Sequence, residues 1–158
     1  MIKMSNYIFK QLRFVRENTL QHVIDVNEQE SIFIPKGFRN HIKWNLGHIY
    51  VVHERFAFYI NPEKMELPEH FIELFAPGTK PADWNESTVP AMKEIISLLD
   101  HQMDRIELNL TNRLVDSIEQ PYTTSKGLTL SSVEEFLSFC LYHEGMHFEA
   151  IKSIRKIS

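Results

Sequence analysis

Two histidines near the end of the chain, His143 and His147, are spaced for chemistry at a metal ion. In an α-helix, residues four apart are offset by about 40° around the axis and by about 6 Å along it. Both imidazoles can then reach one ion, and His-Glu-x-x-His is a known helical form of such a site. The spacing indicates a pair of metal ligands, with an ordinary pair of hydrogen-bonded core histidines as the alternative.

The surrounding residues predict that both imidazoles face the protein interior. One face of the predicted helix is the buried stripe of an amphipathic helix and carries Phe136, Cys140, His143, His147, Ala150 and Ile154. The opposite face is mostly polar. Burying two imidazoles side by side is costly unless they share a partner, and a metal ion would be such a partner.

A third ligand is needed, because catalytic zinc sites commonly take three protein ligands and leave one position for water. In zinc proteases with this motif the third ligand comes from downstream, but only 11 residues follow His147 and they contain no histidine. Their one acid, Glu149, is too near in sequence to turn onto the same site. Ala150 and Ser153 replace the glycine and the third histidine of the extended protease motif. These residues argue against a protease and place the third ligand upstream, on another helix.

The second predicted helix holds the strongest candidates for that ligand, His48 and His53. Each is flanked by apolar residues one turn away, so each is expected to point inward. About 140° separates them around the helix, so they cannot both face one site. His41 shares a face with His48 but lies about 10 Å away along the axis. The remaining histidines have no comparable support from their neighbours: His22, His70 and His101.

The apolar periodicity predicts an all-α fold, a four-helix bundle with a long crossover between helices two and three, formed by residues 1–158 as a single domain. All seven prolines fall in three zones between the helical segments, and no stretch alternates like a half-buried strand. Helix one is expected at residues 5–26, helix two at 40–60 with Asn40 as its N-cap, a short helix at 67–75, and helix three at 87–110. Helix four opens with Ser131-x-x-Glu134, a capping-box pattern.

Charge and cysteine content limit the class of partner. The net charge is −4 and no stripe of Lys or Arg runs along the chain, so no nucleic-acid partner is predicted. The single cysteine, Cys140, excludes a disulfide framework within the chain and fits a reducing compartment. No run approaches the about 18 apolar residues of a membrane span, and no secretory signal is evident. A cytoplasmic protein without a membrane partner is expected.

The combination of Trp44-Asn45-Leu46-Gly47-His48 on one helix with His143 and His147 on the last helix resembles the DinB-like superfamily of metal-binding four-helix bundles. The resemblance spans the chain in length, helix order, long crossover and histidine positions. It implies a metal site formed by His48, His143 and His147, which holds one zinc or nickel ion per chain with water completing the coordination. Many relatives carry Gly-Gln shortly after the last histidine. This chain has Phe148-Glu149-Ala150-Ile151 there, so no pocket contact is carried over from that turn.

The same resemblance implies a metal-dependent S-transferase, because characterised members activate a low-molecular-weight thiol, bacillithiol or mycothiol, for S-transfer or isomerisation. The expected partners are a small thiol and an electrophilic substrate. A metal-dependent hydrolase and a non-catalytic metal-binding or interaction module are the alternatives. A homodimer is also expected, from the resemblance and from apolar residues on more than one face of the second helix, such as Ile42, Trp44 and Val51.

Four residues near the motifs are given structural roles. Cys140 precedes His143 by about one turn, where a free cysteine packs in a core more often than it ligates a metal. Glu144 lies about 60–100° from the histidine direction, so helix pairing or support of the ligands is expected rather than catalysis. Gly47 and Gly145 are costly inside helices, so close approach of another helix is expected at Gly47 and a helix or subunit contact at Gly145.

Overall fold

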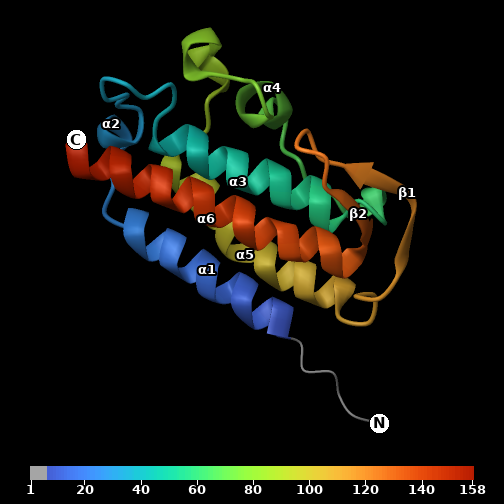
Figure 1. The fold of residues 1–158 in the computed structure, drawn as a ribbon. Coiled ribbons are helices and arrows are strands. Elements are labelled where there is room, and N and C mark those ends of the chain that lie inside the picture. The colour runs from blue at the N-terminus through green and yellow to red at the C-terminus, as the bar shows by residue number, and fades with distance from the viewer. Residues whose placement is uncertain (1–6) are drawn as a thin grey trace.

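The computed structural model describes residues 7–158, and its four longest helices lie side by side (Figure 1). They are α1 (Tyr7–Val23), α3 (Ile42–Ala57), α5 (Met92–Leu110) and α6 (Val133–Ile157). Helix α6 packs against α1 and α3, and α5 packs against the same two helices. The prediction of a mainly helical protein is confirmed, and the predicted start of helix one at Ser5 lies outside the described residues. Within residues 7–158, no helix is long and apolar enough to cross a membrane.

Helix α3 is the most buried of the four, since it contacts α4, α5 and α6. Its apolar residues on several faces, including Ile42, Trp44 and Val51, are therefore covered within the chain itself. Those faces no longer argue for a second subunit. The homodimer stays a prediction that rests on the family resemblance.

Three helix starts differ from the predicted positions. The N-cap of α3 is His41 and not Asn40, because the His41 Nδ1 atom accepts the Trp44 backbone N–H at 3.0 Å. Helix α5 begins at Met92, and the predicted start at residue 87 lies in a short 3-10 turn, η3 (Glu86–Thr88). The N-cap of α6 is Ser132, whose hydroxyl accepts the Glu135 N–H at 3.3 Å, because a strand continues to Ser132. The caps of α3 and α6 are thus made by polar side chains, whereas at the start of α5 the Glu94 carboxylate accepts the backbone N–H of the N-cap residue, Ala91.

The connection between α3 and α5 is long and holds several short elements. These are η1 (Pro62–Lys64), α4 (Phe71–Phe75), η2 (Pro81–Asp83) and η3, while α2 (Glu28–Ser31) lies earlier, between α1 and α3. Helix α4 packs on α3 at Gly47, where a Cβ atom would overlap the Phe75 ring. The expected close approach at Gly47 is confirmed, and it brings the α4 end of the connection onto the helix that carries His48. A Cβ at Gly145 would meet no atom within 4 Å among the described residues.

The expectation that no strand forms is wrong, because residues 117–132 form an antiparallel hairpin. Strand β1 (Ser117–Thr123) pairs with β2 (Thr129–Ser132), with an irregularity in register between Ser117 and Tyr122. Only Ile118 and Leu130 are buried, so the strands carry too few inward residues to produce an alternating pattern. Pro121 is tolerated because a two-stranded sheet consists of edge strands. The turn needs Gly127, whose φ of 91° is in the left-handed region.

A buried ion pair joins α1 to α6 within the helix bundle. The Arg16 guanidinium donates to both carboxylate oxygens of Glu144, at 2.9 and 3.2 Å, and to the Leu99 carbonyl oxygen at 2.7 Å. The Thr19 hydroxyl donates to the same carboxylate at 3.0 Å. Burial opposes ionisation of Glu144, but the Arg16 charge holds its pKa below the ordinary value. Glu144 is therefore a helix-pairing residue, as its position on the helix indicated.

Candidate metal centre

The structure brings together the three histidines that the resemblance selected. His48 comes from the middle of α3, and His143 and His147 come from consecutive turns of α6. One nitrogen from each ring lies within 4.8 Å of the others, and the Nε2 atoms of His48 and His143 are 3.1 Å apart. Two imidazole nitrogens bound tetrahedrally to one zinc ion at about 2.0–2.1 Å lie about 3.3 Å apart. The three rings are therefore positioned to hold a metal ion.

Hydrogen bonds that two of the rings donate to neighbouring groups fix which nitrogen of each ring faces the middle of the three-histidine cluster. The His48 Nδ1–H donates to the Phe75 carbonyl oxygen at 2.7 Å, and the His147 Nδ1–H donates to Asn45 Oδ1 at 2.8 Å. The Nε2 atoms of both rings then carry free lone pairs. Because the His48 lone pair faces His143 Nε2, a cation between these two atoms would satisfy both. In metal sites, a ligating histidine typically donates its other ring N–H to a carbonyl oxygen in the same way.

Burial makes all three rings neutral. Loss of solvent lowers the pKa of His143 to about 2 and that of His147 to about 4, and it also lowers the pKa of His48. The neighbouring histidines add to the effect at His143 and His147, since one protonated ring would repel the next. Neutral imidazole is the form that binds a metal. The donor set thus fits zinc or another divalent ion of similar preference.

The other candidates from the sequence lie outside this cluster. The His53 Nδ1–H donates to the Ile49 carbonyl oxygen at 2.9 Å, and its Nε2 atom lies 3.3 Å from the Glu144 carboxylate. His41 caps α3. Cys140 is buried one turn before His143 in the apolar core, where burial raises the pKa of its thiol. The three remaining histidines contribute no atom to the cluster: His22, His70 and His101.

Sequence reasoning missed the groups that orient the rings. Asn45 lies one turn before His48, and its position in the Trp44–His48 motif was the only signal for it. The Trp44 indole stacks on the His48 ring, with centroids 4.5 Å apart and planes 12° apart. The Phe75 carbonyl could not be found from sequence, because it reaches His48 only through the packing of α4 on Gly47.

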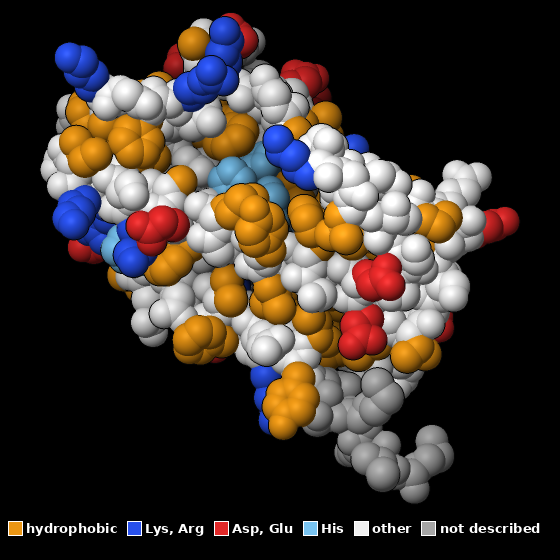
Figure 2. Space-filling view, viewed as in Figure 1, with side chains coloured by type: hydrophobic (Ala, Val, Ile, Leu, Met, Phe, Trp, Pro, Cys, Tyr) orange, Lys and Arg blue, Asp and Glu red, His pale blue; other side chains and the backbone are white. Residues whose placement is uncertain are grey.

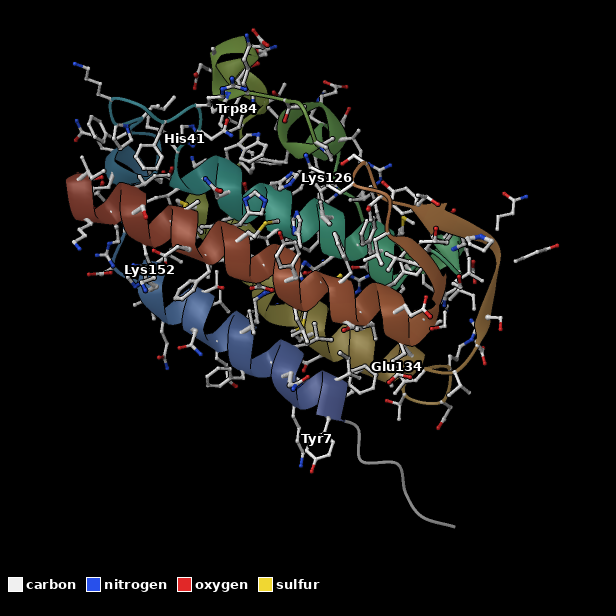
Figure 3. All side chains as sticks on the ribbon, viewed as in Figure 1. Tyr7, His41, Trp84, Lys126, Glu134 and Lys152 are labelled. Atoms are coloured by element: carbon white, nitrogen blue, oxygen red, sulfur yellow. The ribbon has the colours of Figure 1, made fainter. Side chains whose placement is uncertain are left out.

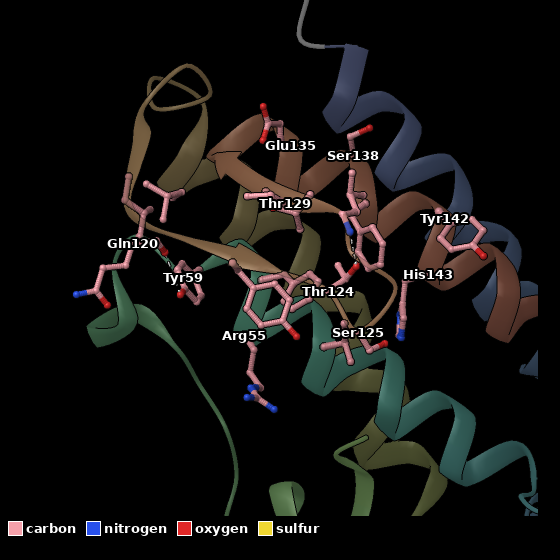
Figure 4. Close-up of a pocket in the computed structure, with 18 of the residues that line it drawn as sticks. Arg55, Tyr59, Gln120, Thr124, Ser125, Thr129, Glu135, Ser138, Tyr142 and His143 are labelled. Carbon is pink, nitrogen blue, oxygen red and sulfur yellow. Dashed lines mark hydrogen bonds between the residues drawn. The ribbon is translucent and has the colours of Figure 1, made fainter. Parts of the chain in front are cut away.

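A cavity of about 1830 Å³ opens beside the three histidines. It lies between the second half of α3, the β1–β2 hairpin and α6, and all three rings line it. Figure 2 shows histidine side chains exposed in a hollow among hydrophobic side chains. Figure 4 shows His143 facing the hairpin turn that carries Thr124 and Ser125. Molecules in the cavity can therefore reach the edges of the imidazole rings that carry the free nitrogen atoms.

Two buried histidines outside the cluster make stability depend on pH. Burial lowers the pKa of His41 and of His53 to about 4, whereas an unfolded histidine titrates near about 6.5. Above pH 6.5 both rings are neutral in either state. Between about pH 6.5 and 4 only the unfolded state takes up the protons, so the free energy of unfolding falls as the pH falls. Each such histidine adds a slope of about 1.4 kcal/mol per pH unit.

Urea unfolding of chelator-treated protein at pH 7 and pH 5 is therefore expected to show a loss of at least about 4 kcal/mol at pH 5, because the three cluster histidines, whose pKa values are also lowered, add to the effect of His41 and His53. His41→Asn is a matched variant, because asparagine is a good N-cap that does not titrate. Its slope between pH 6 and 5 should be smaller by about 1.4 kcal/mol per unit. Equal stability at the two pH values would contradict the neutral, buried state of these rings.

The fold and the histidine cluster agree with a comparison against known protein families. No curated protein was found to match the chain. A family model described as the DinB superfamily matches residues 11–151, a span that contains most of α1, all of α3 and α5, and the three clustered histidines. A match over this much of the chain shows the family. The chain belongs to the DinB superfamily.

Proposed function

We propose that this protein is a cytoplasmic, metal-dependent S-transferase. His48, His143 and His147 would hold one zinc or nickel ion, and a low-molecular-weight thiol such as bacillithiol would be the sulfur donor. The observation that carries the proposal is the convergence of three neutral imidazoles at the wall of a large cavity. A divalent ion bound by three neutral ligands keeps its double positive charge and favours an anion, such as a thiolate or hydroxide, at an open position.

The cavity supports a reaction between two molecules. Typical small-molecule sites occupy about 300–1,000 Å³. The cavity here, at about 1830 Å³, leaves room for a thiol and an electrophile at the same time. The protein's own thiol, Cys140, is buried in the core and does not line the cavity, so the sulfur nucleophile has to enter as a small molecule.

The chain's own groups would position the reactants and the ligands. The Phe75 carbonyl and Asn45 hold the rings of His48 and His147 with their Nε2 atoms toward the cavity. In the transfer, the thiolate sulfur forms a bond to the electrophilic carbon as the leaving group departs with its electron pair. The apolar cavity wall would keep water from competing for the same carbon.

Asn45 offers a test of this positioning. Asn45→Ala removes the acceptor of the His147 Nδ1–H, which leaves that ring free to rotate or change tautomer. Loss of such a partner typically weakens metal affinity by about 10–100-fold. Competition with a chromophoric chelator should measure the change. Asn45→Asp keeps an acceptor at the same place and should retain affinity within a few-fold. If Asn45→Ala binds zinc as tightly as the unchanged protein, Asn45 does not orient a ligand.

The activity itself is tested with metal-loaded protein, bacillithiol or a comparable thiol, and a chromogenic electrophile. We expect a rate above that of the uncatalysed reaction, lost in His143→Ala and retained in His101→Gln, which changes an exposed histidine on α5. The absence of metal-dependent acceleration over a panel of thiols would contradict the proposal. Hydrolysis of ester or amide substrates under the same conditions would favour the hydrolase alternative, and a centre closed by a protein side chain would favour the non-catalytic module.

A further inference from the structure

Three aromatic side chains from segments that are distant in sequence line the cavity together. Phe56 of α3, Tyr122 of β1 and Phe139 of α6 form this aromatic wall, and none of the three is fully buried. The Phe56 ring centroid lies 5.3 Å from that of Tyr122 and 5.6 Å from that of Phe139. Aromatic rings in contact have their centroids at such distances. The three rings thus present one continuous apolar surface to a molecule in the cavity.

Contacts behind the aromatic wall hold it in place. The buried Phe136 ring packs against Phe56, with centroids 5.4 Å apart, and stacks on Tyr59 at 4.8 Å. The Tyr59 hydroxyl donates to the Gln120 carbonyl oxygen of β1 at 3.2 Å, which ties the hairpin to the end of α3. Figure 3 shows that the hairpin turn, labelled at Lys126, also comes back toward α3. The wall is therefore formed before a ligand binds, which lowers the cost of binding.

The aromatic wall and the three histidines belong to the same contact between α3 and α6. On α6, Phe139 precedes His143 by four residues, which is about 6 Å along the helix axis. On α3, Phe56 follows His48 by eight residues, which is about 12 Å. Because Phe56 meets Phe139 and His48 meets His143, the wall lies about 6–12 Å along the cavity from the histidine cluster. One small molecule can therefore touch the wall and reach the open side of the cluster.

The charges of the cavity lining do not select a charged ligand. The lining holds three cationic side chains and three carboxylates: Arg55, Arg113, Lys126, Asp116, Glu119 and Glu135. One cation and one carboxylate, Arg113 and Asp116, pair with each other at 2.9 Å. With the opposite charges in equal number, neither an anion nor a cation is favoured over a neutral molecule. Contact with the aromatic wall is then what distinguishes one ligand from another.

We propose that the electrophile is a neutral aromatic compound, and that Phe56, Tyr122 and Phe139 select it by binding its ring. Contacts between aromatic rings favour an aromatic ring over a saturated ring system of the same skeleton. The thiol loses its proton to solvent, the thiolate sulfur forms a bond to the electrophilic carbon, and a leaving group such as bromide departs with its electron pair. The role as electrophile rests on the proposed function, whereas binding to the wall does not require the transfer.

Unreactive probes test the aromatic wall without the reaction. They are naphthalene-2-carboxamide and decahydronaphthalene-2-carboxamide, its saturated counterpart. Isothermal titration of the full chain should show the aromatic amide binding about two- to tenfold more tightly. The saturated amide has the larger apolar surface, so apolar burial alone would favour it instead.

Variants assign the preference to the wall. Phe139→Leu and Tyr122→Leu keep an apolar side chain but remove a ring, so each should bring the two affinities to within about twofold of each other. The matched control is Phe14→Leu, at an exposed position of α1 outside the cavity, and it should keep the preference. Circular dichroism shows whether each variant still folds.

The same variants connect the wall to the transfer. With metal-loaded protein, a thiol and 2-(bromomethyl)naphthalene, Phe139→Leu should raise the KM for the electrophile and leave the KM for the thiol unchanged. Equal affinity of the unchanged protein for the two amides, or a preference that persists in both wall variants, would overturn the proposal. An aromatic preference without any transfer would leave the wall in place and refute the S-transferase. Transfer without an aromatic preference would refute the wall alone.

Discussion

Replacing His48, His143 or His147 with alanine is expected to abolish metal binding. Three donors that converge within 4.8 Å of one another form a site whose affinity depends on all of them, because two imidazoles alone hold zinc weakly. Metal analysis after gel filtration should fall from about one ion per chain to almost none in each variant. Circular dichroism shows whether the variant still folds.

Two further histidine variants serve as controls for this prediction. His53→Ala and His41→Ala should keep the metal, since His53 bonds to Ile49 and faces Glu144, and His41 caps α3. Both variants are expected to be less stable than the unchanged protein, so their metal content should be measured on the folded fraction. Loss of the ion in His53→Ala alone would mean that the other inward face of α3 supplies the ligand.

Replacing Arg16 with methionine is expected to cost about 3–5 kcal/mol of stability. Arg16 and Glu144 are 2% and 1% exposed, so the substitution leaves a buried carboxylate without its counter-charge. The ionised carboxylate must then be protonated or the helices must separate. Urea unfolding at pH 7 measures the loss.

The double variant Arg16→Met with Glu144→Leu distinguishes an uncompensated charge from a loss of packing. Replacing both members of a buried pair with apolar residues is often neutral, so most of the lost stability should return. The double variant should also keep its metal, because Glu144 points from α6 toward Arg16 on α1 and not toward the three rings. A double variant as unstable as Arg16→Met alone would show that the charge is not the cause.

The helices and the His143–His147 pair could be predicted because both follow from local periodicity. An apolar stripe every three to four residues marks α1, α5 and α6, and the spacing of four sets two imidazoles on one face. The choice of His48 over His53 could not be made in this way. Both point into the protein, one toward the cavity and the other toward Glu144, and only the family resemblance separated them.

The remaining parts of the site depend on contacts between distant segments. The β1–β2 hairpin has only two buried residues, so its sequence carries almost no strand signal, yet it forms one wall of the cavity. The Phe75 carbonyl bonds to His48 across 27 positions in sequence, and this bond exists only because Gly47 lets α4 approach α3. No pattern within one segment predicts either contact.

X-ray absorption at the metal edge, with and without added thiol, shows whether three histidines hold the ion and whether a thiol can reach it. We expect three imidazole nitrogens at about 2.0–2.1 Å together with one oxygen ligand, and no sulfur, in the protein alone. Adding a low-molecular-weight thiol should introduce one sulfur at about 2.3 Å. A sulfur ligand before any thiol is added, or a spectrum that does not change when thiol is added, would contradict a three-histidine centre open to an external thiol.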